Sequence, residues 1–420
     1  MRSQELLDEL KWRDLLFQQT EHVAEALGRG PVTGYVGFDP TAASLHVGNL
    51  VPVMGLVHLQ RAGHRPIVLV GGGTGLIGDP GGKSQERPLS DRDVVAANAA
   101  SIRGQLERFL DFSGPAAARM VDNAEWLLEL RAVDFMRDIG KHFTVNFMLQ
   151  KESVRSRMEA GISFTEFSYM LLQAYDFLEL HRRYGTTLQM GGSDQWGNIT
   201  AGIELIRRTL SADAHAITFP LVMTSEGAKF GKTEAGAVWL DPTLTSPYKF
   251  YQFWINAEDR DVSRYLRFFT LLPRERIDAL DASTLEHPER REAHRALARD
   301  VTARVHGPDA LAAAAEVSGL LFGGAEPSSL SLAAVDVLRD EIPFYPAVNL
   351  TDPQAVIDAV TGDKDALFKS KGDAKRMIQQ GGVYLNGKRL EDTLTSITPL
   401  HGKYVLLRKG GKNYALVCKE

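Results

Sequence analysis

Two short motifs, far apart in the chain, contain residue types that could act on a phosphate. The first is His46-Val47-Gly48-Asn49, and the second is Lys229-Phe230-Gly231-Lys232-Thr233. An imidazole can donate to a phosphate oxygen, and a neighbouring glycine lets a nucleotide approach the backbone closely. The first motif alone also fits a surface histidine at the start of a helix. The second motif, with two lysines and a threonine, strengthens the interpretation as a nucleotide site.

The first motif needs a strand and a helix start to position it. Residues 32–38 form a β-prone run, Asp39-Pro40-Thr41 breaks it, and a helical pattern follows from Leu45 through Leu59. A strand that leads into a helix N-terminus is where α/β sheets bind phosphates, because free backbone N–H groups and the helix dipole favour anions. The pattern predicts a nucleotide site at this turn.

Further strands and helices extend this unit. Residues 3–27 are periodic enough for one helix, and a capping pattern predicts a helix opened by Ser90. The apolar run Pro66–Val70 is typical of a buried parallel strand. A third strand, Arg119–Asn123, ends in polar residues, where open α/β sheets place ligand contacts. Trp126 behind it is interpreted as a core residue.

The glycine-rich segment Gly71–Lys83 nearly fits two known phosphate motifs. A Walker loop is discounted because Ile77 stands where its first glycine should fall. A dinucleotide loop is discounted because Asp79-Pro80-Gly81-Gly82 follows where that motif needs a helix. A ligand-binding loop and a merely flexible loop both stay open.

Three polar residues share one face of a strongly apolar helix predicted over Ile162–Leu180. Tyr169, Gln173 and Asp176 are spaced by four and three, so they project together. Buried polar groups are costly unless paired, so these three should bond one another or a ligand. The next strand closes on a Gly-Gly turn, where Ser193 or Asp194 is expected to cap a helix through Leu210.

Composition indicates an ordinary globular protein with a basic end. The chain has 420 residues, 44% hydrophobic and 24% charged, and one cysteine, Cys418. One cysteine excludes an intrachain disulfide and a Cys-cluster zinc site, and with no signal peptide or membrane span apparent we expect a cytoplasmic protein. Residues 364–420 hold 12 Lys or Arg against 5 Asp or Glu. This end could meet a polyanion such as RNA, or be a solvated tail.

Taken in order, these motifs resemble those of class I aminoacyl-tRNA synthetases, usually written HIGH and KMSKS. The wording GFDPTAASLHVGN, GGSDQWGN and KFGKT is similar to the tyrosyl members, and the resemblance covers essentially the whole chain. The run IQQGGVYLNGK resembles a small RNA-binding module first known from a small-subunit ribosomal protein. Asn49 replaces the family's usual second histidine but retains a donor.

The resemblance implies a tyrosine–tRNA ligase and assigns residues to three roles. Catalytic contacts on the phosphate side would come from His46, Thr41, Lys83, Arg87, Lys229, Lys232 and Thr233. The tyrosine pocket would be lined by Tyr35, Asp79, Tyr169, Gln173, Asp176 and Gln195. ATP would contact Gly37, Asp39, Gly48, Asn49, Gly192, Asp194 and Lys232.

The predicted fold class is α/β, with a Rossmann-like parallel-sheet catalytic domain, a helical domain and a small α+β RNA-binding module. The expected divisions are a catalytic domain over 1–222, a loop and helical domain over 223–325, a linker over 326–352 and an RNA-binding domain over 353–420. ATP is expected as a substrate with Mg²⁺, with no tightly bound cofactor and no metal-ligand cage in the protein. The resemblance also implies tRNA for tyrosine as a partner, and a homodimer.

Three alternatives stay open at this stage. A tryptophanyl enzyme shares the paired motifs, although Tyr35 with Asp176 suits a phenol better than an indole N–H. A catalytically silent relative could bind RNA through the basic end alone. A generic nucleotide-dependent phosphotransferase lacks an identifiable acceptor-activating pattern.

Overall fold

The protein is described from a computed structural model that covers residues 3–79, 91–151, 154–155, 158, 161–228, 230–233, 236–362, 366–392 and 396–419. These residues form two compact units. The first comprises residues 1–245 and 254–305, and the second comprises residues 246–253 and 306–420. Within the described ranges, no helix is both long and apolar enough to cross a membrane.

A six-stranded sheet with the order β1-β6-β5-β2-β3-β4 organises the first unit. Its strands are β1 (Gln18–Gln19), β2 (Thr33–Phe38), β3 (Arg65–Val70), β4 (Arg119–Asp122), β5 (Thr186–Gly192) and β6 (His215–Phe219). All neighbours pair in parallel except β1 with β6. The chain runs outward from β2 through β3 to β4 and resumes on the other side of β2 with β5. Ligands of open α/β sheets bind at such a reversal of strand order.

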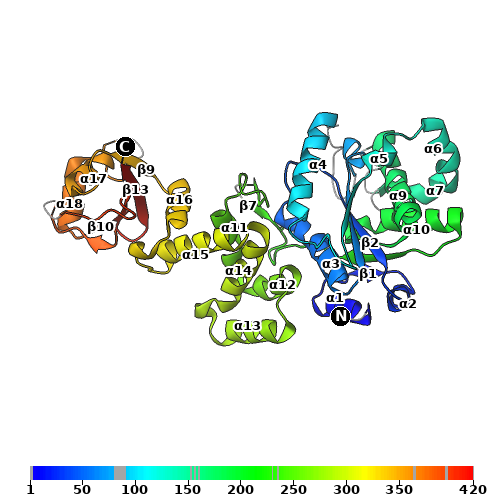
Figure 1. Ribbon diagram of the computed structural model, residues 1–420, viewed down its shortest axis with the longest axis horizontal. Helices are drawn as coiled ribbons and strands as arrows, with labels where there is room; N and C mark the ends of the chain where they lie inside the picture. The colour runs from blue at the N-terminus through cyan, green and yellow to red at the C-terminus, as the bar shows by residue number, and fades with distance from the viewer. Residues whose placement is uncertain are drawn as a thin grey trace. The chain divides into compact units, whose positions relative to one another are not determined.

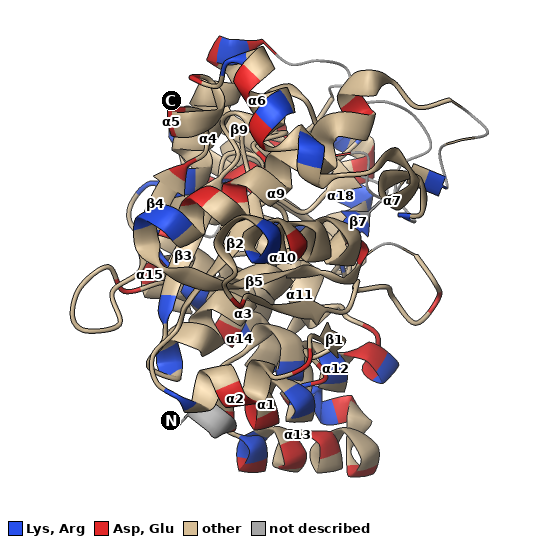
Figure 2. Cartoon of the chain, turned by 90° about the vertical axis from the view of Figure 1, so that its right-hand side faces the viewer, with Lys and Arg blue, Asp and Glu red and all other residues tan. Residues whose placement is uncertain are grey.

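Helices cover both faces of this sheet. Figure 1 shows α3 (Leu50–Arg61) and α4 (Arg92–Leu106) on one face, with α9 (Phe164–Tyr184) and α10 (Trp196–Leu210) on the other. Strands β2 and β5, between these layers, contain no charged residue (Figure 2). Helix α3 approaches β6 closely, because a Cβ on Gly55 would lie only 2.1 Å from the Phe219 ring. The expected Rossmann-like parallel sheet is confirmed.

The other helices are either short connections between β4 and α9 or follow the last strand of the sheet in the chain. Short helices connect β4 to α9: α5 (Ala124–Leu127), α6 (Ala132–Asp138) and α7 (Val145–Leu149). After the sheet come α11 (Pro247–Ile255), α12 (Asp259–Phe269), α13 (Arg274–Glu286), α14 (Glu292–His306) and α15 (Pro308–Phe322). The amphipathic patterns of these segments predicted successive helices.

The prediction of one N-terminal helix over residues 3–27 is wrong. Helix α1 (Ser3–Trp12) ends before Asp14, whose φ is 57°, and α2 (Val23–Gly28) begins separately. Between them the backbone pairs with the sheet, since Phe17 N donates to Thr218 O at 2.8 Å and β1 follows. Pairing with a distant strand thus overrides the helical periodicity.

Three helix starts also differ from expectation. Helix α3 begins at Leu50, after a 3-10 turn over Val47–Asn49. Helix α4 is capped by Asp91, whose side chain accepts from Asp93 N at 2.8 Å, while Ser90 lies outside the described residues. Residues 193–195 form a 3-10 turn ahead of α10, so neither of the two expected side chains caps that helix.

The second unit is built on a five-stranded sheet with the order β11-β10-β12-β13-β9. Its strands are β9 (Phe344–Ala347), β10 (Val383–Leu385), β11 (Lys388–Arg389), β12 (Tyr404–Lys409) and β13 (Asn413–Lys419). Helices α16 (Leu332–Glu341), α17 (Pro353–Ala359) and α18 (Lys371–Gln379) belong to the same unit. The sequence predicts strands around Val383 and Tyr404, and both are present as β10 and β12. Strands β9, β11 and β13 were not expected, and β9 joins the sheet through parallel pairing with the distant β13.

Candidate active site

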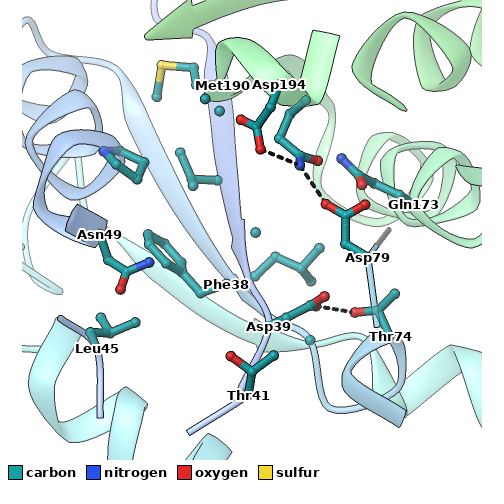
Figure 3. A pocket seen from close by; sticks show the side chains of 18 of the residues that line it. Phe38, Asp39, Thr41, Leu45, Asn49, Thr74, Asp79, Gln173, Met190 and Asp194 are labelled. Atoms are coloured by element: carbon teal, nitrogen blue, oxygen red, sulfur yellow. Dashed lines mark hydrogen bonds between the residues drawn. The ribbon is translucent and has the colours of Figure 1, made fainter. Parts of the chain in front are cut away.

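A pocket of about 520 Å³ lies beside the carboxyl ends of β2, β3 and β5. Its lining includes Tyr35 and Phe38 from β2, Gly71 after β3, and Met190 from β5. Figure 3 shows side chains from these strands and from the following loops pointing into a common space. This is the reversal of strand order, where the fold places a ligand.

Asp176 and Tyr35 form the buried part of the pocket. Both Asp176 oxygens accept hydrogen bonds, from Asn123 Nδ2 at 2.9 Å and from Trp126 Nε1 at 2.8 Å. Burial raises the pKa of the Asp176 carboxyl to about 8, although these two donors favour the charged form. Burial, followed by the Asp176 charge, also raises the pKa of Tyr35 well above its ordinary value.

The Tyr35 hydroxyl has no hydrogen-bond partner among the described residues, although its atom is fully buried. The ring itself is held by an edge-to-face contact with Phe177, with the two ring centroids 5.3 Å apart. A buried hydroxyl without a partner is costly, so its presence on a pocket wall indicates a polar group on the ligand.

Asp39, directly after β2, connects the end of that strand to helix α9. Its two oxygens accept from Tyr169 Oη and from Thr74 Oγ1, each at 2.7 Å. Thr74 Oγ1 in turn accepts from Asn123 Nδ2 at 2.9 Å. Gly71 must be a glycine here, because a Cβ would lie 2.1 Å from Asp39 Oδ1. The network fixes the Tyr169 hydroxyl within the pocket wall.

A second polar group lies near the carboxyl end of β5. Gln195 Nε2 donates to Asp79 Oδ2 at 2.6 Å and approaches Asp194 Oδ2 at 3.4 Å (Figure 3). Gln173 Oε1 accepts from Asn198 Nδ2 at 2.9 Å. Burial raises the pKa of the Asp194 carboxyl above its ordinary value. Carboxylates and amides are therefore concentrated where a charged ammonium group or ribose hydroxyls could bind.

His46 presents one ring nitrogen to the pocket in a defined protonation state. Gly48 N donates to His46 Nδ1 at 3.1 Å, and His46 N donates to Asn49 Oδ1 at 3.0 Å. Because Nδ1 accepts, the proton of the neutral ring is on Nε2. Burial and then the Lys232 charge lower the pKa of His46, which keeps the ring neutral near pH 7. Nε2–H is a hydrogen-bond donor for a phosphate oxygen.

The backbone of one residue, Val238, joins the two distant motifs. Val238 N donates to Gly231 O, and Val47 N donates to Val238 O, both at 3.0 Å. Gly231 has a φ of 78°, and a Cβ there would lie 2.5 Å from a Val47 methyl group. Only glycine permits this approach, which brings Lys232 and His46 to the same pocket.

Comparison with known proteins agrees with this geometry. The family described as tRNA synthetases class I (W and Y) matches residues 28–323, and the tyrosine--tRNA ligase SYY-like C-terminal domain matches residues 338–417. A tyrosine--tRNA ligase of Roseiflexus castenholzii is 52% identical over 98% of this chain and 99% of its own. The chain belongs to the tyrosyl-tRNA synthetase family. The corresponding ligase of Geobacillus stearothermophilus is 49% identical over 98% of this chain and 99% of its own.

Solved structures of tyrosyl- and tryptophanyl-tRNA synthetases have a fold similar to that of this tyrosyl-tRNA synthetase family member. A truncated mitochondrial tyrosyl-tRNA synthetase from Aspergillus nidulans superposes with a TM-score of 0.69 at 30% identity, over 76% of this chain and 94% of its own. A tryptophanyl-tRNA synthetase from Encephalitozoon cuniculi reaches 0.54 at 13% identity, over 74% of this chain and 91% of its own. The latter likeness concerns the fold alone.

Most of the residues that the family resemblance singled out meet in this pocket. All six residues predicted for tyrosine binding line it: Tyr35, Asp79, Tyr169, Gln173, Asp176 and Gln195. So do Gly37, Asp39, Thr41, His46, Asn49, Gly192, Asp194 and Lys232. Gly48 stands behind His46, since a Cβ would lie 2.8 Å from that ring. The predictions for Lys83, Arg87 and Lys229 fall outside the described residues, and for Thr233 the structure describes only the backbone.

Three residues of the pocket network escaped the sequence assignment. The sequence marks Asn123 only as the polar end of a strand and Thr74 only as part of a glycine-rich segment. Trp126 is indeed buried, with 3% exposed, but its indole N–H also holds Asp176. The sequence signal for this role is a tryptophan shortly after the end of a strand. From there its indole N–H can reach the ligand site at the carboxyl end of the sheet.

Proposed function

We propose that the chain activates L-tyrosine with ATP and transfers the tyrosyl group to the 3′ end of a tRNA for tyrosine. The observation that carries this proposal is the buried hydroxyl of Tyr35, which has no hydrogen-bond partner among the residues that the structure describes. It lies beside Asp176 in the pocket that His46 and Lys232 also line. The phenol of tyrosine would accept from Tyr35 and donate to Asp176. Phenylalanine would leave the Tyr35 hydroxyl unpaired and would offer no donor to Asp176, which makes its binding unfavourable.

In the first step the tyrosine carboxylate attacks the α-phosphorus of ATP, a new O–P bond forms, and pyrophosphate leaves. A carboxylate is already ionised near neutral pH, so positioning and charge stabilisation suffice for catalysis. His46 Nε2–H and Lys232 would donate to phosphate oxygens, with Thr41 beside them. On the strength of the motifs alone, Lys83, Arg87, Lys229 and Thr233 would join them over the leaving group.

The amino-acid end would orient the substrate for this attack. Tyr169, Gln173 and Asp79 would surround the ammonium group, and Gln195 would contact the carboxylate. Asp39 accepts hydrogen bonds from Tyr169 and Thr74, so it would hold Tyr169 in place. Asp39 would also contact ATP, together with Gly37, Asn49, Gly192 and Asp194. In the second step the terminal ribose hydroxyl of the tRNA attacks the tyrosyl carbonyl and AMP leaves.

Mg²⁺ would enter with ATP as part of the substrate, held mainly by phosphate oxygens and water. The compartment would be the cytoplasm, which fits a chain with one cysteine. The functional division of the chain would be catalytic over 1–222, loop and helical over 223–325, connecting over 326–352 and RNA-binding over 353–420.

The tRNA would be held by the second unit. Lys371, Lys375 and Arg376 are exposed on α18, and Lys388 and Arg389 are exposed on β11. The phosphates of RNA attract such a basic surface, and binding would weaken as salt rises. The match of residues 338–417 to a tyrosine--tRNA ligase C-terminal domain supports this role.

A second copy of the chain is the proposed occupant of an apolar surface on the first unit. Val133 and Met136 on α6, Val145 on α7 and Phe164 at the start of α9 are 77%, 52%, 61% and 68% exposed. Large apolar side chains that are exposed to this extent are typical of a protein interface when they gather on one surface. Sedimentation should show a dimer that Val133→Asp dissociates, and a monomeric wild-type chain would contradict this part of the proposal.

The decisive experiment is amino-acid-dependent exchange of labelled pyrophosphate into ATP, with tyrosine, phenylalanine and tryptophan tested separately. Exchange with tyrosine alone, followed by charging of a tRNA for tyrosine, is the expected result. Exchange led by tryptophan would overturn the specificity and keep the enzyme class. No exchange with any of the three would favour a protein that only binds RNA.

A further inference from the structure

Helix α12 contacts the loop that leads to Lys232, although the helix itself does not line the pocket. In that loop Thr224 N donates to Ala228 O at 2.9 Å, and Phe230 N donates to Val222 O at 3.3 Å. These bonds fold residues 222–228 back on themselves ahead of Phe230, and Ser225 is exposed at the bend. The bend faces the first turn of α12.

Asp261, in that first turn, binds the bend through charged hydrogen bonds. Its side chain is buried, with 3% exposed. Oδ2 accepts from Ser225 N at 3.0 Å and from Ser225 Oγ at 2.9 Å. Oδ1 accepts from Arg264 Nη2 at 3.0 Å, and the same nitrogen donates to Met223 O at 2.6 Å. One carboxylate therefore organises both sides of the bend.

An aromatic cluster holds the other end of the loop. The Phe230 ring stacks on Phe269 with centroids 5.1 Å apart, and lies 4.9 Å from Tyr265 and 5.7 Å from Trp254. Tyr265 belongs to both groups, because its hydroxyl also approaches Asp261 Oδ2 at 3.4 Å. Helix α12 thus contacts the loop twice, through the hydrogen bonds between Ser225 and Asp261 and through the packing of Phe269 and Tyr265 on Phe230.

These contacts influence the pocket through Phe230, which α12 holds and which precedes Gly231 and Lys232 in the chain. Phe230 is followed directly by Gly231, which packs against Val47, and then by Lys232, which lines the pocket. Displacement of Phe230 would move Gly231 away from Val47 and carry the Lys232 ammonium group away from His46.

We propose that Asp261 is a positioning residue for tyrosine activation, which holds Ser225 and the aromatic cluster so that Lys232 stands beside His46. The inference rests on the proposed function. Asp261 touches no substrate in this scheme, so its loss should lower the rate of the phosphate chemistry and leave the binding of tyrosine unchanged.

The test compares two serines whose hydroxyls donate to different aspartates. Ser225 donates to Asp261 from the loop, and Ser263 on α12 donates to Asp281. Ser225→Ala removes a hydroxyl that donates to Asp261, and the residue is exposed, so the chain should fold normally. Ser263→Ala is the matched control on α12 itself, because its hydroxyl donates to Asp281 Oδ2 at 2.7 Å, away from the loop. Asp261→Asn removes the charge and keeps the shape.

The measurements are kcat of tyrosine-dependent pyrophosphate exchange and the equilibrium Kd for tyrosine. We expect kcat to fall about tenfold in Asp261→Asn and about threefold in Ser225→Ala, with the Kd for tyrosine within about twofold of wild type throughout. Ser263→Ala should change neither quantity. Equal effects of the two serine variants, or a parallel loss of tyrosine affinity, would overturn the inference. Absence of exchange in the wild-type chain would overturn the proposed function with it, whereas an active wild type beside a fully active Asp261→Asn would overturn this inference alone.

Discussion

The amino-acid end and the phosphate end of the pocket are built in different ways. At the amino-acid end, Asp176 is buried and both of its oxygens are already bonded, to Asn123 and Trp126. At the phosphate end, Lys232 is exposed and the His46 ring is oriented through a backbone N–H. At the first end a buried carboxylate is held firmly by two donors, whereas the second end is an open edge with hydrogen-bond donors.

This difference matches what each end must do. Discrimination between similar amino acids needs buried polar groups that pay a penalty when the wrong ligand leaves them unpaired. Acceleration of the reaction needs contacts that strengthen only as charge develops on the phosphate. Variants at the two ends should therefore change different quantities, and the following predictions test that separation.

The largest expected effect follows from Asp176→Ala. The change strands the N–H groups of Asn123 and Trp126 and removes the acceptor for the substrate phenol, so tyrosine-dependent exchange should fall by about 10³-fold or more. Glu179→Ala is the control, since Glu179 on the same helix pairs with Arg182 and Arg183 outside the pocket. Exchange within about tenfold of wild type in Asp176→Ala would contradict the assignment of the amino-acid end.

A smaller effect, on a different quantity, is expected for His46→Asn. Loss of the Nε2–H donor should lower kcat of exchange about 10²-fold, because one donor to a developing charge contributes about that much. The Kd for tyrosine should stay unchanged. His64→Asn is a matched control, because His64 also accepts a backbone N–H, from Val32 at 3.1 Å, but lies outside the pocket. A large rise in the Kd for tyrosine in His46→Asn would break the separation of the two ends.

Tyr35→Phe should give a modest change in specificity. The ring contact with Phe177 is retained, and only the hydroxyl that faces the ligand is lost. The ratio of kcat/KM for tyrosine over phenylalanine should drop about tenfold, the value of one hydrogen bond in a buried site. An unchanged ratio would mean that the phenol binds elsewhere in the pocket.

A separate prediction concerns the pH dependence of stability and not catalysis. The pKa of Asp176 is about 8 in the folded chain, against 3.8 for an ordinary aspartate. A raised folded pKa contributes stability that is present below pH 3.8 and is lost as pH rises through about 8. Asp176→Asn should therefore flatten the fall in Tm between pH 4 and pH 8, as followed by calorimetry. The same slope in wild type and variant would show that burial does not perturb this carboxyl.

The sequence alone predicted the elements whose pattern is local. Strands β2, β3 and β4 follow from short apolar runs between turn residues, and α9 with its face of Tyr169, Gln173 and Asp176 follows from spacings of three and four. The two phosphate motifs were also recognisable, because their residue types and order are intact in this chain. These features depend on neighbours within a few residues.

The tertiary structure alone decided the features that depend on distant partners. Pairing with β6 splits the N-terminal helix into two, and pairing with β13 creates β9. The bonds of Trp126 to Asp176, of Val238 to both motifs and of Asp261 to Ser225 join residues that no local spacing relates. Periodicity records which face of an element is buried, whereas the identity of the group that meets that face is set by how the whole chain packs.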